Sequence, residues 1–458
     1  MFYSSRATGR EVLPVYSCMR RRSVGTIGLC ALAVLLLGCT SPAAVGAGRP
    51  TPPAVSSSAL GHPTPAVSQR TSAPWPSPVT YPASGPTTVA ALRTAHWNAL
   101  PPAPIAVRNG AVGAWTGTRM LVWGGSDGTR SYADGAAYDP ATRVWTKLPA
   151  APISARAGAD SVWTGSLLFI WGSYADRTDS VTDGAVYDPA TRRWTTLPPP
   201  PFSGLGPSAA VWTGSTVVLL TSPRAEPSGN GPEVVYAQSY DPARNAWTPL
   251  PKLGLPPDQG LGELSAVAVD GHVFAWAMWS HTAGKPDSSF TTSGVDAYQL
   301  DTATTQWSRN TLAPGGGSGV FGPLWTGREI LVPTLSTWCG GCAGPMRFNA
   351  SGVRIDPRTS TLRPLPHGPV SDLNASYVWT GAVVLGVGAN AEMGSARPGD
   401  TAAWDPRTNA WTTLPRAPLA AYDPVAVWTG TTLLVWGTLY APGGSTTSSA
   451  TTGLRLGP

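Results

Sequence analysis

A unit of about fifty residues repeats along this chain, and a self-similar period of that length indicates a repeat array and not one irregular domain. Its clearest copy spans residues 111–149, AVGAWTGTRMLVWGGSDGTRSYADGAAYDPATRVWTKLP. Two apolar runs flank a Thr-Gly turn, a polar loop follows, and the copy ends on Tyr-Asp-Pro and Trp-x-x-Leu-Pro. The chain also holds 52 glycines and 48 prolines among 458 residues, so we expect turns and short strands instead of long helices.

Each unit predicts four antiparallel strands, which make one blade of a β-propeller. The first two strands join at a Trp-Thr-Gly turn, replaced in the fourth unit by Asp270-Gly271, itself a strong hairpin signal. An Asp-Pro turn joins the third strand to the fourth, because Asp caps the following amides and Pro presets φ. The turn tryptophans are Trp115, Trp163, Trp212, Trp325, Trp379 and Trp428.

The two ends of the repeat array complement each other. The last unit stops after a third strand, residues 453–458, and the missing fourth strand stands at the start, in residues 97–101. Pairing these two segments would close a ring and remove both exposed sheet edges. The sequence therefore predicts an all-β fold, a seven-bladed β-propeller of four-stranded antiparallel blades over residues 92–458, closed by the N-terminal strand pairing with the C-terminal blade.

The first unit resembles the Kelch-repeat family, whose blades carry Gly-Gly after the second strand, then a Tyr and then a Trp. Gly124-Gly125, Tyr138 and Trp145 match that pattern. The resemblance covers residues 97–458, a region that is similar to the central domain of galactose oxidase. It implies a fold but no particular activity. Other units depart from the double glycine, which is replaced by Gly172-Ser173, Leu220-Thr221, Ala277-Met278 and Val332-Pro333.

The first residues read as a secretory signal. Three arginines from Arg20 precede an apolar run, Val24–Leu37, which is too short to span a bilayer as a mature helix. Leu36-Leu37-Gly38-Cys39 resembles the bacterial lipobox, which implies cleavage before Cys39 and diacylation of Cys39. An ordinary signal peptide with an incidental cysteine is the alternative. We expect residues 1–38 to be a lipoprotein signal peptide.

A tether follows the signal peptide. Residues 39–91 consist mainly of Pro, Ser, Thr, Ala and Gly, with almost no charge and no apolar period. Such a segment cannot bury enough surface to offset its ordering entropy, so we expect it to be disordered. The predicted location is the extracytoplasmic face of a bacterial cell membrane, with the Cys39 lipid as the only membrane contact.

The charge of the remaining chain excludes some partners. The formal charge is +6, but residues 1–38 hold five arginines and one glutamate, so the rest carries 26 basic and 24 acidic groups. A near-neutral body gives no concentrated basic face for phosphates, and we expect no nucleic-acid partner. We expect a monomer.

The order of the antiparallel strands in each blade predicts which face of the ring binds a ligand. The short Thr-Gly and Asp-Pro turns share one face, so the long, variable loops share the other, hereafter the long-loop face, and binding residues gather on such loops. The expected long loops are 126–134, 173–183, 222–233, 279–294, 334–351, 389–400 and 438–452. Trp279 and Trp338 fall in these loops as candidate ligand contacts, whereas most other tryptophans are expected to pack between blades.

Two arginines stand at the start of the first two blades. Arg108 and Arg156 each lie seven residues before the turn Trp of their blade, on the long-loop face. A forked guanidinium there suits a ligand carboxylate or a pair of sugar hydroxyls. The alternative is an arginine that bonds loop carbonyls.

Cys339 and Cys342 form a Trp-Cys-Gly-Gly-Cys segment that looks like the redox motif of thioredoxins, yet no strand-helix pattern surrounds it. Outside the cytoplasm a small disulfide that stiffens the fifth blade's loop is the simplest prediction, with a redox or metal role as alternatives. The five histidines are scattered singly. We assign no metal, no cofactor and no catalytic residue.

These features predict a lipid-anchored binding module that holds a glycan, a cell-wall fragment or a protein on its long-loop face. The alternative is a sugar-modifying enzyme, such as an isomerase or mutarotase, with an Arg and carboxylates at the channel mouth. A structural lipoprotein of an envelope complex is a third class, and a large exposed apolar patch would mark it.

Overall fold

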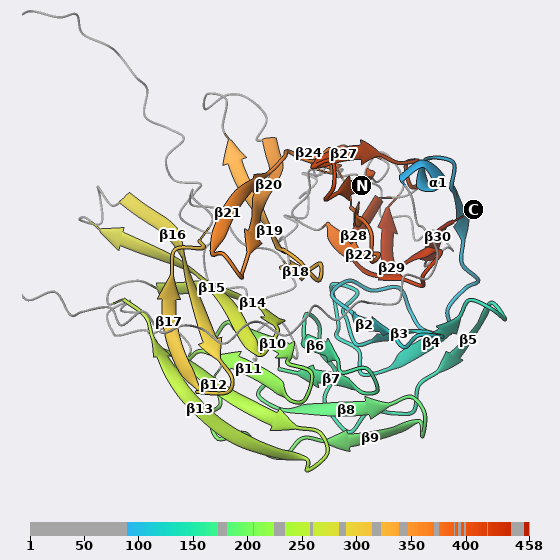
Figure 1. Cartoon of the computed structure of the whole chain (residues 1–458). Coiled ribbons are helices and arrows are strands. Elements are labelled where there is room, and N and C mark those ends of the chain that lie inside the picture. Colours follow the sequence, from blue (N-terminus) through green and yellow to red (C-terminus); the bar gives the residue numbers. More distant parts are fainter. Residues whose placement is uncertain are drawn as a thin grey trace, which may run out of the picture. The chain divides into compact units, whose positions relative to one another are not determined.

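The structure is a computed structural model (Figure 1), and the part it describes begins at residue 89. The described ranges are 89–172, 181–204, 206–223, 234–256, 260–283, 290–313, 322–338, 347–370, 375–388, 390–392, 395–397, 400–418, 420–440 and 453–457. The predicted signal peptide, nearly all of the predicted tether, Cys39, Cys339 and Cys342 lie outside these residues. All described residues belong to one compact unit.

Seven four-stranded antiparallel sheets form a ring, so the predicted seven-bladed propeller is confirmed (Figure 1). Blades 1 and 2 contain β2 (Val112–Trp115), β3 (Met120–Trp123), β4 (Gly135–Asp139), β5 (Val144–Lys147), and β6 (Asp160–Trp163), β7 (Leu168–Trp171), β8 (Gly184–Asp188), β9 (Arg193–Thr196). Blades 3 and 4 contain β10 (Ser208–Trp212), β11 (Val217–Thr221), β12 (Val234–Asp241), β13 (Ala246–Gly254), and β14 (Gly260–Val269), β15 (His272–Ala283), β16 (Phe290–Asp301), β17 (Gln306–Asn310). Blades 5 and 6 contain β18 (Leu324–Trp325), β19 (Ile330–Trp338), β20 (Arg347–Asp356), β21 (Thr361–Leu365), and β22 (Ser376–Trp379), β23 (Val384–Val387), β26 (Thr401–Asp405), β27 (Ala410–Thr413). Blade 7 contains β28 (Ala420–Trp428), β29 (Leu433–Tyr440), β30 (Gly453–Gly457) and β1 (His96–Ala99).

The ring closes through blade 7, as the sequence predicts. Strand β1 pairs antiparallel with β30, with His96 opposite Gly457 and Ala99 opposite Leu454. The first strand of each blade lies against the first strand of the next, and β2 of blade 1 lies against β28 of blade 7. N-terminal and C-terminal chain therefore share one sheet, and β1 covers the edge that β30 would otherwise expose.

Two small elements lie outside the blades. Helix α1 (Val89–Arg93) precedes β1, and its Leu92 is buried against the apolar side chains between blades 6 and 7. A two-stranded hairpin, β24 (Asn390–Glu392) and β25 (Ser395–Arg397), leaves blade 6 between its second and third strands. Among the described residues, no helix has the length and apolar character needed to cross a membrane.

The turn chemistry follows the sequence. In blade 1 the Asp139 carboxylate accepts hydrogen bonds from the amides of Ala141 and Thr142, at 2.9 and 3.3 Å. Arg143 closes that turn with a φ of 57°, and a left-handed residue stands at the same place in five other blades. Thr116 caps the Thr-Gly turn between β2 and β3, where its hydroxyl accepts the Arg119 amide at 3.0 Å. Short local bonds thus set both hairpins, and the register of each blade with them.

Neighbouring blades are joined by a hydrogen bond that repeats around the ring. The indole Nε1 of the fourth-strand Trp donates to the carbonyl of a proline in or just after the fourth strand of the preceding blade, at 2.8–3.0 Å. The pairs are Trp97 with Pro415, Trp145 with Pro101, Trp194 with Pro149, Trp247 with Pro198, Trp307 with Pro251 and Trp411 with Pro366. The predicted packing role of these tryptophans is confirmed, and a polar contact fixes each ring.

A second indole often completes the contact. Trp123, at the end of β3, has its ring 5.8 Å from that of Trp194 in the next blade. Trp171 packs on Trp247 at 5.8 Å, and Trp436 of blade 7 packs on Trp145 at 6.2 Å. Tilted or edge-to-face aromatic pairs at these distances add to the stabilisation from buried area.

Blade 5 departs from this scheme on both of its sides. Leu362 occupies the place of the fourth-strand Trp, and 37% of its surface is exposed. On the other side, Pro333 stands where blades 1, 2 and 7 have their second-strand Trp, so Trp411 of blade 6 has no indole to meet there. A shallow apolar depression, partly open to solvent, lies there between Pro333, Tyr377, Trp404 and Trp411.

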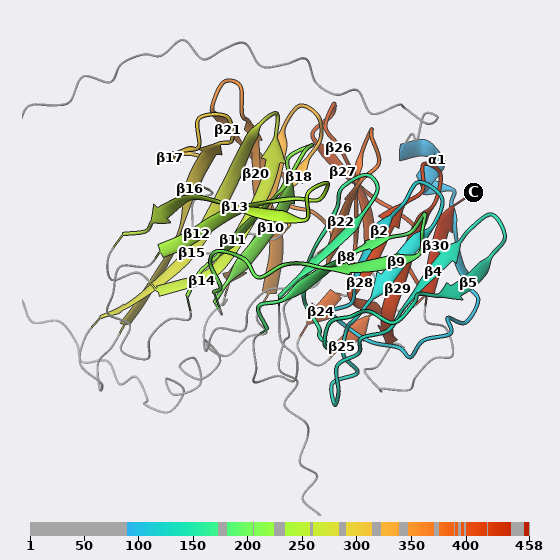
Figure 2. The same ribbon diagram turned by 90° about the horizontal axis from the view of Figure 1, so that it is seen from below.

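The middle strands of blades 4 and 5 correct one prediction. Trp279 and Trp338 do not lie in irregular loops: Trp279 is in the 12-residue strand β15, and Trp338 ends the nine-residue strand β19 (Figure 2, yellow and orange). The described parts of the expected loops 279–294 and 334–351 continue the hairpins instead. Cross-strand pairing outweighs local propensity there, because β16 and β20 supply partners along the full length of each strand.

Trp194→Phe should lower the free energy of unfolding by about 1–2 kcal/mol, because it removes the hydrogen bond to Pro149 and part of the contact with Trp123. Urea denaturation measures the change. Trp279→Phe is the matched control, since the Trp279 Nε1 has no hydrogen-bond partner, and its loss should be smaller. Equal losses in the two variants would show that the bond contributes nothing.

Leu362→Trp should raise the free energy of unfolding by about 1 kcal/mol, because the indole can reach the carbonyl of Ala313. Ala313 follows the buried Leu312 at the end of blade 4, where most other blades have Leu-Pro. Thermal denaturation of this variant is compared with that of Leu362→Phe, which adds a ring without a donor. Equal melting temperatures would rule out the added hydrogen bond.

Candidate functional site

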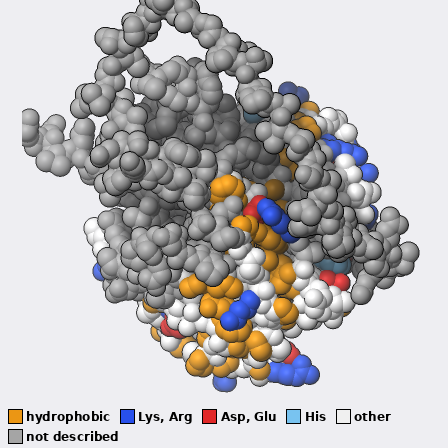
Figure 3. All heavy atoms as spheres, turned by 90° about the vertical axis from the view of Figure 1, so that its left-hand side faces the viewer, with side chains coloured by type: hydrophobic (Ala, Val, Ile, Leu, Met, Phe, Trp, Pro, Cys, Tyr) orange, Lys and Arg blue, Asp and Glu red, His pale blue; other side chains and the backbone are white. Residues whose placement is uncertain are grey.

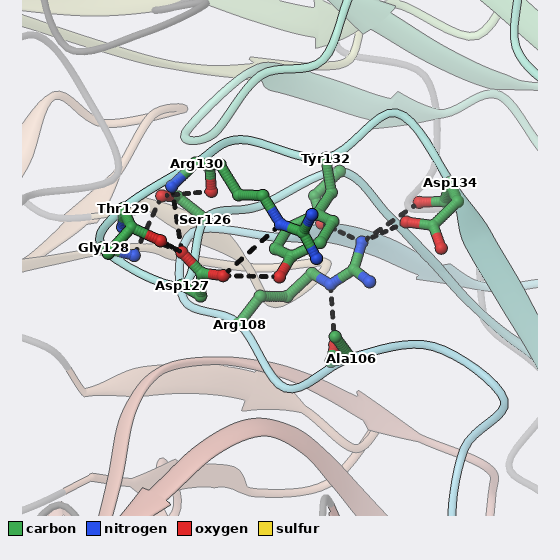
Figure 4. A network of polar contacts seen from close by, with 10 residues as sticks. Ala106, Arg108, Ser126, Asp127, Gly128, Thr129, Arg130, Tyr132 and Asp134 are labelled. Carbon is green, nitrogen blue, oxygen red and sulfur yellow. Dashed lines mark hydrogen bonds and ion pairs between the residues drawn. The ribbon is translucent and has the colours of Figure 1, made fainter.

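The long-loop face holds the candidate site. In every blade the connection from the second to the third strand, and the connection to the next blade, lie opposite the Thr-Gly and Asp-Pro turns. In blade 1 this connection is described throughout, from Gly124 to Asp134. It packs beside the segment that carries Arg108, and the two segments form a polar network (Figure 4).

Arg108 is buried within blade 1. Its Nε donates to the Ala106 carbonyl at 2.8 Å, and its Nη1 donates to the Gly124 carbonyl at 3.4 Å. The same nitrogen pairs with the Asp134 carboxylate at 2.5 Å. The guanidinium therefore joins the first segment of the blade to the ends of its second and third strands.

Arg156 repeats this arrangement in blade 2. Its Nε donates to the Ser154 carbonyl at 2.9 Å, and its Nη1 donates to the Gly172 and Asp183 carbonyls at 3.3 and 3.1 Å. Its Nη2 bonds the Ser154 hydroxyl at 2.9 Å and the Asp183 carboxylate at 2.7 Å. Burial lowers the pKa of the Arg156 guanidinium, and the Asp183 carboxylate opposes that shift.

These contacts favour the alternative that the sequence left open, an arginine that bonds loop carbonyls. Both side chains are 0% exposed. They still differ in one atom: every guanidinium nitrogen of Arg156 has a partner, whereas the Nη2 of Arg108 is buried without one. Ligand contact by either arginine stays a prediction.

Tyr132, which the sequence analysis did not single out, is the centre of the blade 1 network. The Arg108 guanidinium lies 3.9 Å from the centre of its ring, and that of Arg130 lies 4.9 Å from it (Figure 4). The Tyr132 hydroxyl donates to the Asp127 carboxylate at 2.6 Å. No spacing rule points to this residue, because its partners come from two separate segments of the blade.

Asp127 is held as an anion by its own loop. Hydrogen bonds from the hydroxyls of Thr129 and Tyr132 are the largest causes that keep the pKa of the Asp127 carboxyl well below its usual range. The amides of Thr129 and Arg130 donate to the same carboxylate at 2.8 and 2.9 Å. This carboxylate keeps its charge near neutral pH and does not carry a proton to exchange.

The exposed part of the network is charged. The side chain of Arg130 is 71% exposed, and those of Asp134 and Asp127 are 51% and 31% exposed. Gly125 lies behind them with a φ of 100°, and a Cβ on it would come within 2.9 Å of the Arg108 side chain. Glycine is therefore required here both for the backbone conformation and for the close approach of Arg108.

The inner strands contribute further polar contacts on this face. Asp160 begins β6, Ser208 begins β10, and the Ser208 hydroxyl donates to the Asp160 carboxylate. Both residues lie near the long-loop end of their strands. This contact joins blades 2 and 3.

The other predicted site residues lie apart from the blade 1 network. Trp279 is partly buried in blade 4 opposite Gly294, and a Cβ on Gly294 would come within 2.4 Å of the indole. Trp338 belongs to blade 5, and Cys339 and Cys342 follow it outside the described residues, so the predicted disulfide stays a prediction. Among the described residues, no group of three or more His, Cys, Asp or Glu is placed to hold a metal ion.

Comparison with known proteins finds no protein-family model that matches this chain and no curated protein that matches it. The propeller architecture therefore rests on the structure itself.

Arg156→Ala should lower the free energy of unfolding by about 2 kcal/mol or more, because it leaves the buried Gly172 and Asp183 carbonyls without a donor. Arg156→Lys should recover part of this loss, since one ammonium cannot reproduce the forked contacts. Chemical denaturation measures both variants against Arg328→Ala, an exposed arginine on the opposite face. An Arg156→Ala variant as stable as Arg328→Ala would show that the buried contacts of Arg156 contribute nothing to the free energy of unfolding.

Proposed function

We propose that this propeller is a binding module that holds a glycan or a cell-wall fragment on its long-loop face. The chain is anchored at the extracytoplasmic side of a bacterial membrane by a lipid on Cys39. The lipobox-like segment before Cys39 and the uncharged Pro-rich tether support the anchor, and the near-neutral body argues against a nucleic-acid partner. A tether of this kind leaves the folded ring free to reach a ligand beyond the membrane surface.

The blade 1 network is the observation that carries this proposal. Arg108, Tyr132 and Asp127 are fixed by bonds to one another and to the backbone, so the exposed groups of Arg130 and Asp134 stand on a rigid base. Charged and polar groups held in place on a scaffold suit recognition of hydroxyl and carboxylate groups, because little freedom is lost on binding.

Membership of the Kelch-repeat family belongs to the same proposal. Gly124 and Gly125 both have positive φ, of 69° and 100°, and the rings of Tyr138 and Trp145 lie 5.0 Å apart. The residues that carry the resemblance thus have distinct structural roles in blade 1. Blades 2 to 7 lack the glycine pair after the second strand, so the resemblance rests mainly on blade 1.

A sugar-modifying enzyme is the weaker candidate. An isomerase or mutarotase needs a carboxyl group that gains and loses a proton near neutral pH. The Asp127 carboxyl has a pKa far below that range, since the Thr129 and Tyr132 hydroxyls stabilise its anion. Its hydrogen bonds within the loop fit a structural anion better than an acid or a base.

Arg130→Ala should weaken glycan binding by about tenfold, because the variant removes an exposed guanidinium that can donate two parallel hydrogen bonds to a ligand. A glycan and cell-wall-fragment array with the full chain identifies the ligand, and titration calorimetry then measures the affinity. The fold should stay intact, since the Arg130 side chain is mostly exposed.

Arg328→Ala is the matched control, an exposed arginine in the short turn of blade 5 on the opposite face. Its affinity should equal that of the unaltered chain. The proposal would be wrong if no glycan or cell-wall fragment bound, or if both variants lost the same affinity.

A further inference from the structure

A second group of aromatic and basic side chains lies on blade 3. The rings of Phe202 and Tyr236 are stacked, with centres 4.9 Å apart and planes 14° from parallel. The ammonium of Lys252 lies 5.3 Å from the Phe202 ring centre and 4.9 Å from that of Tyr236. Both rings are half-buried, and Lys252 is exposed.

The sequence separates these residues, and the blade brings them together. Phe202 lies in the connection between blades 2 and 3, Tyr236 lies near the start of β12, and Lys252 lies near the end of β13. All three positions are toward the long-loop face of blade 3. In Figure 3, which looks at the side of the ring with β13 and β17, hydrophobic side chains form a band with isolated basic side chains among them.

A buried glutamine holds the aromatic pair in place. Gln238 is 0% exposed, its amide oxygen accepts the Phe202 amide at 3.1 Å, and its amide nitrogen donates to the Phe202 carbonyl at 2.9 Å. The side chain therefore mimics a strand partner for a residue outside any strand. The position of the Phe202 backbone is set before any ligand arrives, which lowers the ordering cost of binding.

Lys252 has no carboxylate partner among the described residues. Lysine is also rare in this chain. The full sequence contains Lys147, Lys252 and Lys285 against a background of many arginines. The exposed ion pairs on the described blades use arginine. In the part of the chain that the structure describes, this ammonium lies over two rings without a carboxylate, so it is a cation beside an apolar surface.

We infer that Phe202, Tyr236 and Lys252 form a binding site for an acidic sugar, a pyranose that carries a carboxylate. One face of a pyranose consists of C–H groups and packs on an aromatic ring, and the ring carboxylate pairs with the ammonium. The site is separate from the blade 1 network and goes beyond the proposed function, because it names the charge of the ligand and a different blade.

Titration calorimetry of the full chain with polygalacturonate oligomers tests this inference, with the methyl-esterified oligomers as the matched neutral ligand. The acidic form should bind about tenfold more tightly, since esterification removes the charge and keeps the sugar ring. Raising the salt concentration should weaken binding of the acidic form only.

Two variants test the residues. Lys252→Met should reduce binding of the acidic oligomer by about tenfold and leave the neutral one unchanged, whereas Tyr236→Ala should weaken both. Lys252→Arg should keep the preference for the acidic form. Lys147→Met, an exposed lysine at the end of β5, is the control and should change nothing.

Equal binding of the two oligomers, or equal effects of Lys252→Met and Lys147→Met, would overturn the inference, as would no binding at all. None of these results touches the blade 1 network, which Arg130→Ala tests separately. A failure here with intact Arg130-dependent binding leaves the proposed function standing.

Discussion

The hydrogen bond from a fourth-strand indole to the proline carbonyl of the preceding blade is the contact on which this ring depends. The strand-to-strand backbone bonds lie within each blade. Between blades 1 and 2 the backbone bonds come from the loop segments, such as that from the Gly125 amide to the Arg156 carbonyl. The indole fills the space between two sheets, and its N–H fixes the distance between them. Each such contact involves only two blades, and its repetition around the circle makes closure cooperative.

The proline in this contact has a second use. It lies in or just after the outermost strand, which forms the outer edge of each blade, and proline offers no N–H to a strand from another molecule. One short sequence, Trp-x-x-Leu-Pro, thus joins neighbouring blades and protects the edge. Leu-Pro without the Trp, as in blade 5, keeps the edge protected but gives up the contact with blade 4.

The two faces of the ring obey different constraints. On one face, short turns are closed by Thr and Asp side chains that bond the next few amides, so their sequences vary little from blade to blade. On the other face, the connections differ in length from blade to blade, and the polar side chains that stabilise them differ as well. Blades 1 and 2 use a buried arginine, blade 4 pairs Arg309 with Asp296, and blade 6 pairs Arg416 with Asp400. The candidate sites lie on the long-loop face because the side chains vary there from blade to blade.

The sequence by itself determined the number of blades, the four-strand unit, the turn positions and the closure between residues 97–101 and the C-terminal segment. These features depend on local sequence patterns and on a unit that repeats seven times. One sequence therefore contains enough copies of the unit to identify them. The sequence also indicated which tryptophans pack between blades.

Tertiary structure alone decided the roles of the site residues. Arg108 and Arg156 look equal in sequence, but only the fold shows that one guanidinium is saturated and the other keeps a free nitrogen. Tyr132 and the trio of Phe202, Tyr236 and Lys252 have no sequence signal, because their partners come from different segments. Trp279 and Trp338 looked like loop residues since local composition favours loops, whereas the next strand of the same hairpin pairs with each of them and extends the sheet.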